Sequence, residues 1–299
     1  MIEQKLRIFR TAAITGNFTE AAALLGMTQP NVTQQIAKLE KELKVLLFSR
    51  NGRTLSLTPA GETLLEECER LFSLESEVLR KVRCAEEKKH FFTLGGTLIA
   101  GSFLLIGMTT LFERSFPNYV MGLKIARLDT LLPRLASGEL ALAVTEEPCE
   151  KENFLSEPYC KDLLLPVFAP GVVKNTRFSL GDYIRKGGKV LISEFGDSTH
   201  LAFRSFLREK GLPEPEPDRI TEAGSLEALK QLLQAGAGIA VLSSLAVESE
   251  ARSGVLRSGV FTEGTFSREI RFVYHPAGDQ KFIRKFISFC VKHRGVSLK

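Results

Sequence analysis

The sequence predicts an α+β multidomain chain: an N-terminal winged helix-turn-helix, a long helix, and a C-terminal α/β domain. Three observations indicate this fold class. A glycine turn separates two short amphipathic helical segments near the N-terminus, and an apolar stripe then recurs at helical spacing from about residue 59 to residue 88. Beyond residue 91, strand-like and helical segments alternate. The 299 residues suffice for two or three compact units.

The composition is that of an ordinary globular protein, with 44% hydrophobic and 25% charged residues. No stretch of eighteen consecutive apolar residues occurs, so no transmembrane helix and no membrane partner are expected. The first five residues lack the pattern of a secretory signal. We therefore expect a cytoplasmic protein.

The five cysteines are scattered without a CxxC pair, which favours reduced thiols in a reducing compartment. A redox pair of Cys149 and Cys160 stays open as an alternative. The four histidines lie far apart, so neither a metal site nor another cofactor is expected.

Motifs for catalysis are missing from the sequence, which contains no P-loop, HExxH or GxSxG pattern. Gly236-Ala237-Gly238 superficially resembles a dinucleotide loop. It precedes a predicted strand instead of following one, and the third glycine is missing at the required spacing. We therefore expect no enzyme, although residues distant in the sequence can converge on a catalytic site.

Positive charge is concentrated in the first 60 residues, which hold eight Lys and Arg but four Asp and Glu. This segment thus accounts for four of the five excess positive charges of the chain. A local basic surface favours a polyanionic partner, although an ordinary solvated face has the same composition.

The first helix is predicted over residues 2–15 and ends at Gly16-Asn17. A second helix is expected over residues 20–25, with Thr19 as its N-cap. Gly26 follows at a tight turn, where a positive φ is cheap only without a Cβ.

A third helix is expected after Thr28, its predicted N-cap, with Pro30 in the first turn. Its predicted buried stripe consists of Val32, Ile36, Leu39 and Leu43. Helix, glycine turn and helix form a helix-turn-helix, and the third helix fits the major groove of DNA.

The outward side chains of the third helix suit the recognition of bases. Amides pair with adenine and hydroxyls bond more permissively, so we predict base contacts from Gln29, Asn31, Thr33, Gln34 and Gln35. Thr28 and Lys38 are better placed for phosphate. A polar surface helix also occurs in proteins that bind no DNA.

A short two-stranded wing is predicted over residues 46–58. Asn51-Gly52 is a strong hairpin signal, and the residues after it alternate between apolar and polar. Arg50 and Arg53 near the tip could reach phosphate or the minor groove.

The spacing of many residues between Leu6 and Gly61 resembles the LysR-type transcriptional regulator family. The resemblance is carried by Phe18-Thr19-Glu20-Ala21-Ala22, Leu25, Thr28-Gln29-Pro30-Asn31-Val32-Thr33, Gln35-Ile36, Leu39-Glu40, Leu47-Phe48, Arg50, Leu57-Thr58 and Ala60-Gly61. Thr33 stands where serine is usual and still supplies a hydroxyl. The resemblance implies a sequence-specific DNA-binding regulator whose activity a small-molecule effector modulates. It leaves RNA polymerase open as a further partner.

A long helix is predicted from Pro59 to about Lys88, with Thr58 as its N-cap. Its apolar stripe consists of Leu64, Cys68, Leu71, Leu74, Val78 and Val82. Such a stripe needs a partner, and a symmetric copy is the simplest one. The two subunits would then place their copies of the third helix about 34 Å apart, where they bind a pseudo-palindromic operator in double-stranded DNA. The alternative is that the helix packs on its own domain.

The resemblance implies a homodimer and also a homotetramer.

After a charged hinge at residues 86–90, strands and helices alternate as in α/β units. Strands are predicted over residues 92–100, 120–126, 140–144, 162–169, 189–193, 219–221, 238–242 and 268–274. Helices are predicted over residues 105–116, 130–137, 199–210, 225–235 and 280–292.

The resemblance implies that this C-terminal domain is periplasmic-binding-protein-like, with two lobes and a ligand cleft between them. It rests here on Gly101-Ser102, residues 138–143, 224–228 and 236–240. Two crossings between lobes are expected at residues 158–166 and 262–268. Lobe one would then comprise residues 91–162 and 267–299, and lobe two residues 163–266. The predicted domains are residues 1–58, the linker helix and hinge at 59–90, and the effector-binding domain at 91–299.

Ligands of α/β sheets bind at the carboxyl ends of strands, near helix N-termini. On this basis we predict effector contacts at Ser102, Phe103, Leu128, Ser193, Ser198 and Thr199. Caps and loop polar groups would give the same pattern without a ligand. The apolar run at residues 103–106 and the acidic Asp129 favour a partly apolar effector. The sequence does not identify the effector. An alternative to a regulator is a solute-binding protein in which the N-terminal helices are only an accessory domain. The missing export signal argues against that alternative.

Overall fold

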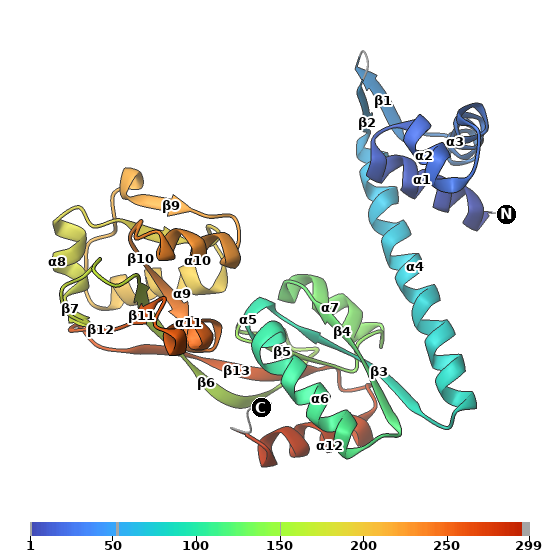
Figure 1. Cartoon of the computed structure of the whole chain (residues 1–299). Helices are drawn as coiled ribbons and strands as arrows, with labels where there is room; N and C mark the ends of the chain where they lie inside the picture. Colours follow the sequence, from blue (N-terminus) through green and yellow to red (C-terminus); the bar gives the residue numbers. More distant parts are fainter. Residues whose placement is uncertain (1, 52–53, 150, 295–299) are drawn as a thin grey trace. The chain divides into compact units, whose positions relative to one another are not determined.

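The computed structural model describes residues 2–51, 54–149 and 151–294, in two compact units, residues 1–88 and 89–299 (Figure 1). The N-terminal unit contains the predicted helix-turn-helix, wing and long helix. Its elements are α1 (Ile2–Thr15), α2 (Phe18–Leu25), α3 (Gln29–Leu43), β1 (Phe48–Asn51), β2 (Thr54–Leu57) and α4 (Pro59–Glu86).

The turn between α2 and α3 depends on Gly26, whose φ of 64° confirms the predicted left-handed turn. The predicted cap of α2 was wrong. Asn17 caps the helix instead of Thr19, because Asn17 is extended and its side chain accepts a hydrogen bond from the Thr19 N–H at 2.8 Å. The helix therefore begins at Phe18, two residues earlier than expected.

The apolar face of α3 packs into the core of the N-terminal unit. Val32, Ile36 and Leu39 are buried against α1 and α2, as predicted. Leu43 was also predicted in this stripe but is 42% exposed, because α3 ends there and Lys44 turns the chain with a φ of 58°. This packing fixes which face of α3 remains outside.

Only the first half of α4 packs against the other elements of the N-terminal unit. Thr58 accepts a hydrogen bond from the Gly61 N–H at 3.0 Å, as expected of an N-cap, and Cys68 is buried in the core. Farther along, apolar side chains are exposed by between 46% and 63%: Leu71, Leu74, Val78, Leu79 and Val82. We call these five residues the α4 stripe.

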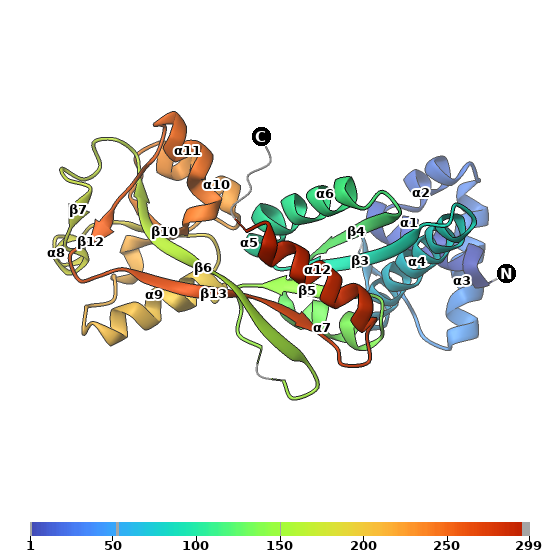
Figure 2. The ribbon, with the colours of Figure 1, turned by 90° about the horizontal axis from the view of Figure 1, so that it is seen from below.

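The C-terminal unit contains a sheet of two similar halves, joined by two long antiparallel strands (Figure 2). The strand order is β4-β3-β5-β13-β6-β10-β8-β9, and β11 pairs with β6. Strands β3, β4 and β5 are parallel in one half, and β8, β9 and β10 are parallel in the other. We call the halves lobe one and lobe two. The long strands β6 and β13 join the two halves. The crossing predicted at residues 158–166 falls within β6, whereas the one predicted at residues 262–268 overlaps only the start of β13.

The strands of this sheet are β3 (His90–Gly96), β4 (Tyr119–Ile125), β5 (Leu142–Thr145), β6 (Leu155–Phe168), β8 (Val190–Ile192), β9 (Ile220–Glu222), β10 (Ile239–Ser243), β11 (Arg257–Ser258) and β13 (Phe266–Tyr274). The helices are α5 (Leu98–Ala100), α6 (Ile106–Ser115), α7 (Leu128–Ala136), α8 (Leu180–Arg185), α9 (Ser198–Glu209), α10 (Leu226–Gln234), α11 (Glu248–Ser253) and α12 (Gln280–Lys292). Several elements were not predicted from the sequence: α8, α11, β11 and the small pair β7 (Arg177–Phe178) and β12 (Val260–Phe261).

The first strand of lobe one ends earlier than predicted. It was expected to reach residue 100 but stops at Gly96, and a π-helical turn over Gly101–Leu105 links α5 to α6. The cause is a close backbone approach, since a Cβ on Gly96 would lie 2.4 Å from the Cα of Gly101. The chain therefore enters the helix directly after the strand.

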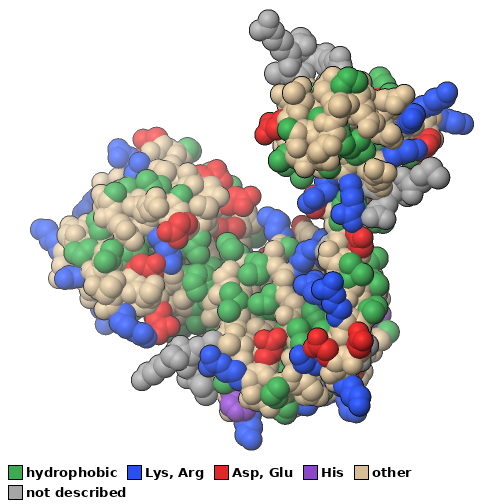
Figure 3. All heavy atoms as spheres, turned by 45° about the vertical axis from the view of Figure 1, so that its right-hand side comes forward, with side chains coloured by type: hydrophobic (Ala, Val, Ile, Leu, Met, Phe, Trp, Pro, Cys, Tyr) green, Lys and Arg blue, Asp and Glu red, His purple; other side chains and the backbone are tan. Residues whose placement is uncertain are grey.

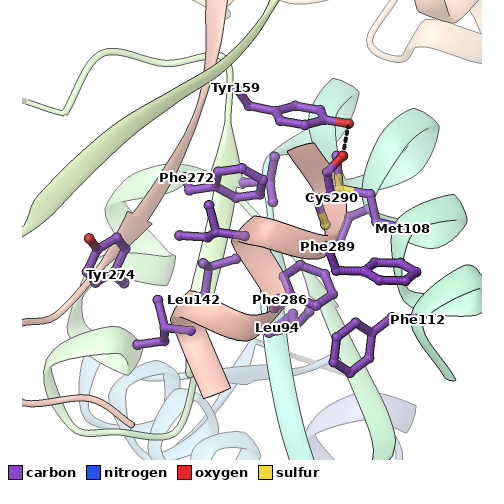
Figure 4. Close-up of a cluster of buried hydrophobic side chains, with 14 of the residues drawn as sticks. Leu94, Met108, Phe112, Leu142, Tyr159, Phe272, Tyr274, Phe286, Phe289 and Cys290 are labelled. Atoms are coloured by element: carbon purple, nitrogen blue, oxygen red, sulfur yellow. Dashed lines mark hydrogen bonds between the residues drawn. The ribbon is translucent and has the colours of Figure 1, made fainter. Parts of the chain in front are cut away.

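Aromatic side chains fill the core of lobe one, between the sheet and the helices α6 and α12 (Figure 4). Phe112 and Phe286 are fully buried, with ring centroids 5.2 Å apart. The Tyr159 hydroxyl donates to the backbone carbonyl of Cys290 at 3.4 Å. Lobe two has its own core around Phe168, Phe203 and Phe206.

Among the described residues, one helical segment, Leu98–Ser115, is long and apolar enough to cross a membrane by length and composition, whereas no such helix was expected. It spans α5, the π-helical turn and α6, and its buried residues include Leu105, Met108 and Phe112. These three side chains pack in the core of lobe one. All five cysteines lie within the described residues and are free thiols.

Candidate nucleic-acid interface and effector cavity

The outer face of α3 presents a row of polar side chains. Thr28, Gln29, Asn31, Gln34 and Lys38 are exposed, and Thr33 and Gln35 are half-buried. Thr28 is the N-cap, but its side chain makes no capping hydrogen bond. The Gln29 side-chain amide donates to the Thr33 hydroxyl at 2.9 Å, which orients both side chains. Thr28 and the six predicted residues of α3 are therefore all at least partly accessible to solvent.

The position of this surface is set by the opposite side of α3, where Val32, Ile36 and Leu39 are buried. The Glu40 carboxylate accepts a hydrogen bond from the Leu47 N–H at 2.8 Å and so ties the end of α3 to the segment before the wing. Lys and Arg side chains stand out from the N-terminal unit (Figure 3). Polar amides and cations on an exposed helix suit base edges and phosphates.

The wing is an antiparallel hairpin, as predicted, but Asn51 ends β1 and pairs with Thr54, so it is a strand residue and not the first turn residue that the Asn-Gly signal indicated. Arg53, one of the two predicted wing contacts, lies outside the described residues. Arg50 belongs to β1, and only its backbone is described.

A cavity of about 660 Å³ lies in the C-terminal unit, at the carboxyl ends of the parallel strands of both lobes. Residues following β3, β4 and β5 line it from lobe one, and residues following β8 line it from lobe two. Arg268 on the crossing strand β13 also lines it. This is where α/β sheets bind ligands.

Three of the six predicted effector contacts line this cavity: Ser193, Ser198 and Thr199. The other three do not. Ser102 and Phe103 lie on the π-helical turn, and Leu128, the first residue of α7, is buried in the core. Because β3 ends four residues earlier than predicted, Leu98 and Ile99 line the cavity in place of Ser102 and Phe103.

Phe103 instead contacts the other lobe. The Lys230 ammonium of α10 lies 5.6 Å from the centroid of its ring and 2.7 Å from a carboxylate oxygen of Glu250. A cation above an aromatic face is attracted to it. This contact therefore links the two lobes beside the cavity.

Sequence reasoning missed four acidic residues that line the cavity, Glu194 and Asp197 on lobe two and Glu146 and Glu147 on lobe one. The buried Glu146 carboxylate accepts hydrogen bonds from the Thr97 hydroxyl and the Ala100 N–H, the latter at 3.1 Å. Burial raises the pKa of Glu147, and the neighbouring Glu146 raises it further. The signal for Glu146 and Glu147 was available, since they lie two and three residues after the strand predicted at residues 140–144.

The start of α9 on lobe two is capped by Asp197. Its carboxylate accepts hydrogen bonds from the His200 N–H at 2.7 Å and from the Ser193 hydroxyl. Ser198 and Thr199 in the first turn of α9 hydrogen-bond to a guanidinium instead.

That guanidinium belongs to Arg268, which is only 9% exposed. Its Nε donates to Asp162 at 2.9 Å, and its Nη1 donates to Ser198 at 2.8 Å and to Thr199 at 3.3 Å. Its Nη2 is buried and has no hydrogen-bond partner among the described residues. Burial raises the pKa of Asp162, and hydrogen bonds from Ser243 and Arg268 act against that rise.

Comparisons with known proteins agree with this arrangement. Residues 4–62 match the family described as bacterial regulatory helix-turn-helix protein, lysR family, and residues 86–295 match the LysR substrate binding domain. A probable RuBisCO transcriptional regulator of Nostoc sp. is 30% identical over 289 residues, which cover 91% of this chain and 82% of that protein. The HTH-type transcriptional regulator CbbR of Xanthobacter flavus is 27% identical over 257 residues, 85% of this chain and 76% of that protein.

Solved structures of full-length regulators share the fold. CbnR, a LysR family transcriptional regulator, superposes with a TM-score of 0.77 at 19% identity, covering 99% of this chain and all of that one. CbnR in complex with its target DNA gives a TM-score of 0.76 at 19% identity, covering 97% of this chain and 98% of that one.

Proposed function

This chain belongs to the LysR family of bacterial transcription regulators, and from that premise we propose that it binds its operator as a homo-oligomer and responds to an effector between its lobes. Family membership gives it a DNA-binding N-terminal domain and an effector-binding C-terminal domain. We propose boundaries at residues 58 and 90, with the linker helix and hinge at 59–90.

The exposed polar row on α3 is the observation that carries the DNA-binding part of the proposal. Five of its seven residues are exposed, and the buried stripe behind them fixes the row outward. We propose that the amides bind base edges in the major groove and that Thr28 and Lys38 bind phosphates. Contacts from Arg50 and Arg53 of the wing complete the proposed interface.

The α4 stripe supports pairing of two subunits. Five large apolar side chains on one long helix are exposed, and burying them against a second copy would remove that surface from water. A symmetric pair would present two α3 helices to a pseudo-palindromic operator. Assembly to a homotetramer and contact with RNA polymerase are further proposals, which the family resemblance alone supports. We propose that the protein acts in the cytoplasm.

The cavity supports the effector part of the proposal. Its volume of about 660 Å³ is typical of small-molecule sites. Because both lobes contribute to its wall, a bound ligand can favour one arrangement of the lobes. Ser193, Ser198 and Thr199 are the proposed polar contacts. Contacts at Ser102, Phe103 and Leu128 stay sequence predictions.

A mobility-shift assay with DNA taken from beside the protein's own gene tests the proposal. We expect binding that weakens steeply as salt rises and that survives competition by unrelated DNA. A thermal-shift screen of metabolites then identifies ligands, since a molecule that binds only the native state raises its stability. Lack of DNA binding at low salt would reject the DNA-binding part.

A further inference from the structure

One wall of the cavity is formed by residues 193–197 between β8 and α9, which we call the β8–α9 loop. Four of its five residues line the cavity: Ser193, Glu194, Gly196 and Asp197. The fifth, Phe195, lines a smaller pocket of about 170 Å³ in lobe two, together with His200 of α9. Because residues of the loop line both spaces, a change in the smaller pocket can alter the wall of the larger one.

Side chains from outside the loop hold its backbone N–H groups. The Glu222 carboxylate at the end of β9 accepts a hydrogen bond from the Phe195 N–H at 2.9 Å. The Nδ1 atom of His200, in the first turn of α9, accepts a hydrogen bond from the Gly196 N–H at 3.0 Å. The rings of His200 and Phe195 also meet edge to face, with centroids 5.3 Å apart. The loop therefore depends on His200 for a hydrogen bond and for an aromatic contact.

The hydrogen bond from Gly196 can form only while the His200 imidazole is neutral. In a neutral imidazole one nitrogen accepts and the other carries the proton, whereas in an imidazolium both nitrogens are donors. Protonation of His200 therefore brings two N–H groups face to face and breaks this hydrogen bond. Burial of the ring lowers its pKa below the ordinary value of 6.5. The neutral, accepting ring is consequently the form that the folded chain favours at neutral pH.

Charged groups from several elements surround the ring. The carboxylates of Asp197, Glu214 and Glu222 favour its protonation and the Arg204 guanidinium opposes it, while burial sets the net direction of the pKa shift. In the neutral state these carboxylates already have partners. Asp197 caps α9, Glu222 holds the loop, and a carboxylate oxygen of Glu214 lies 2.8 Å from the Arg204 guanidinium. An imidazolium competes with these partners, so protonation weakens a second anchor of the loop.

We propose that His200 makes this wall of the cavity sensitive to pH: its protonation releases the Gly196 N–H and loosens the β8–α9 loop against which a ligand binds. The folded chain takes up this proton at a lower pH than the unfolded chain. The stabilising hydrogen bond is therefore complete above pH 6.5 and is lost as the pH falls below that value. A ligand that needs the ordered loop binds the neutral form more tightly, so acid weakens its binding. This consequence rests on the proposed function of the cavity as the effector site.

Proton NMR and hydrogen exchange of the full chain test the pH response. The chain has four histidines, so the ring signal that disappears in His200→Asn identifies the titration of His200. We expect this ring to titrate below pH 6.5. Gly196 is exposed, so water replaces the lost acceptor, and the peptide that contains the loop should exchange about two- to tenfold faster, relative to its intrinsic rate, once His200 is protonated. A ring that stays neutral down to about pH 5, or exchange that keeps to the intrinsic pH dependence, would overturn the inference.

Two histidine variants assign the response to its residue. His200→Asn keeps a side-chain acceptor near the position of Nδ1 but cannot titrate, so its loop should show no extra exchange in acid. His275→Asn is the matched control. The Nδ1 atom of His275 also accepts a backbone hydrogen bond, from the Ala277 N–H at 3.2 Å, but His275 is not among the described residues that line the cavity. This control should respond to pH as the parent chain does. An undiminished response in His200→Asn would show that another group is its source.

The inference and the proposed function fail in different ways. If metabolites of the thermal-shift panel raise the melting temperature but exchange of the loop keeps to the intrinsic pH dependence, the effector site stands and the role of His200 is wrong. If the loop responds to acid through His200 but no member of the panel changes the melting temperature or DNA binding, the pH response stands and the effector function is wrong.

Discussion

Arg268 and Asp162 lie directly opposite each other on β13 and β6, the two strands that join the lobes. The Arg268 Nε is 2.9 Å from a carboxylate oxygen of Asp162, whose side chain is fully buried. The other oxygen of Asp162 accepts from the Ser243 hydroxyl at 2.6 Å. This ion pair therefore fixes the crossing strands at the wall of the cavity and holds Arg268 against the start of α9.

Asp162→Asn should destabilise the protein by about 3 kcal/mol or more, because it leaves the buried guanidinium without a counter-charge. Urea denaturation followed by circular dichroism measures the loss. Asp182→Asn is the control, since its partner Arg185 and Asp182 itself are about 60% exposed and such pairs contribute less than about 1 kcal/mol. Similar losses in both variants would argue against a structural role for the buried pair.

Gly96→Ala should cost about 1–3 kcal/mol, since the added Cβ would lie 2.4 Å from the Cα of Gly101 and the backbone must shift. Gly26→Ala is a useful comparison. No atom lies within 4 Å of a Cβ at Gly26, so only its positive φ opposes the substitution, at about 1 kcal/mol. Denaturation midpoints of the two variants compare their losses of unfolding free energy. A larger loss of stability for Gly26→Ala than for Gly96→Ala would contradict the steric explanation.

Gln34→Ala and Lys38→Ala should affect DNA binding differently. Gln34 is an exposed amide proposed to bind a base, so its loss should relax sequence preference by about 1–3 kcal/mol at one position of the operator. Lys38 is proposed to bind phosphate, so its loss should weaken all sequences alike and reduce the salt dependence. Titrations against the operator and point-substituted operators separate the two outcomes. Equal discrimination by both variants would refute the assigned roles.

Leu74→Glu should convert an oligomer into monomers while leaving the subunit folded. Leu74 is 52% exposed on the α4 stripe, so a charge there costs little in the single chain but would be buried in a paired helix. Sedimentation velocity measures the association state, and circular dichroism checks the fold. Glu66→Ala on the opposite side of α4 serves as the control and should leave the assembly unchanged. An unaltered sedimentation profile for Leu74→Glu would exclude pairing through this stripe.

Acid should destabilise lobe two through Glu263. Burial by itself raises the pKa of this carboxyl, but hydrogen bonds from the Gly181 N–H, the Ser179 hydroxyl and the Leu180 N–H outweigh it and lower the pKa to about 2. Between pH 4.5 and about 2 the unfolded chain binds the extra proton, so stability falls as pH falls through this range. Glu263→Gln should flatten this part of the profile of unfolding free energy against pH. The same slope in the variant would exclude Glu263 as its source.

The sequence by itself determined the features that depend on local pattern. Local pattern predicted the positive φ of Gly26 and the first-turn position of Pro30. It also predicted the burial of Val32, Ile36 and Leu39 and the length of α4. They follow from helical periodicity, caps and turn chemistry, which act over a few residues. The bounds of α12 were predicted to the residue, because a strong apolar period and the Asp279 cap define it.

Only the tertiary structure decided which side chains meet at the cavity. Glu146, Arg268 and Ser198 are far apart in the chain, and their proximity depends on where β3, β5 and β8 end relative to the crossing strands. The predicted end of β3 was wrong because Gly96 and Gly101 approach each other through backbone contact, which leaves no periodic signal in the sequence. The charged residues that line the cavity come from segments far apart in the chain, so they could be placed only once the two lobes were folded.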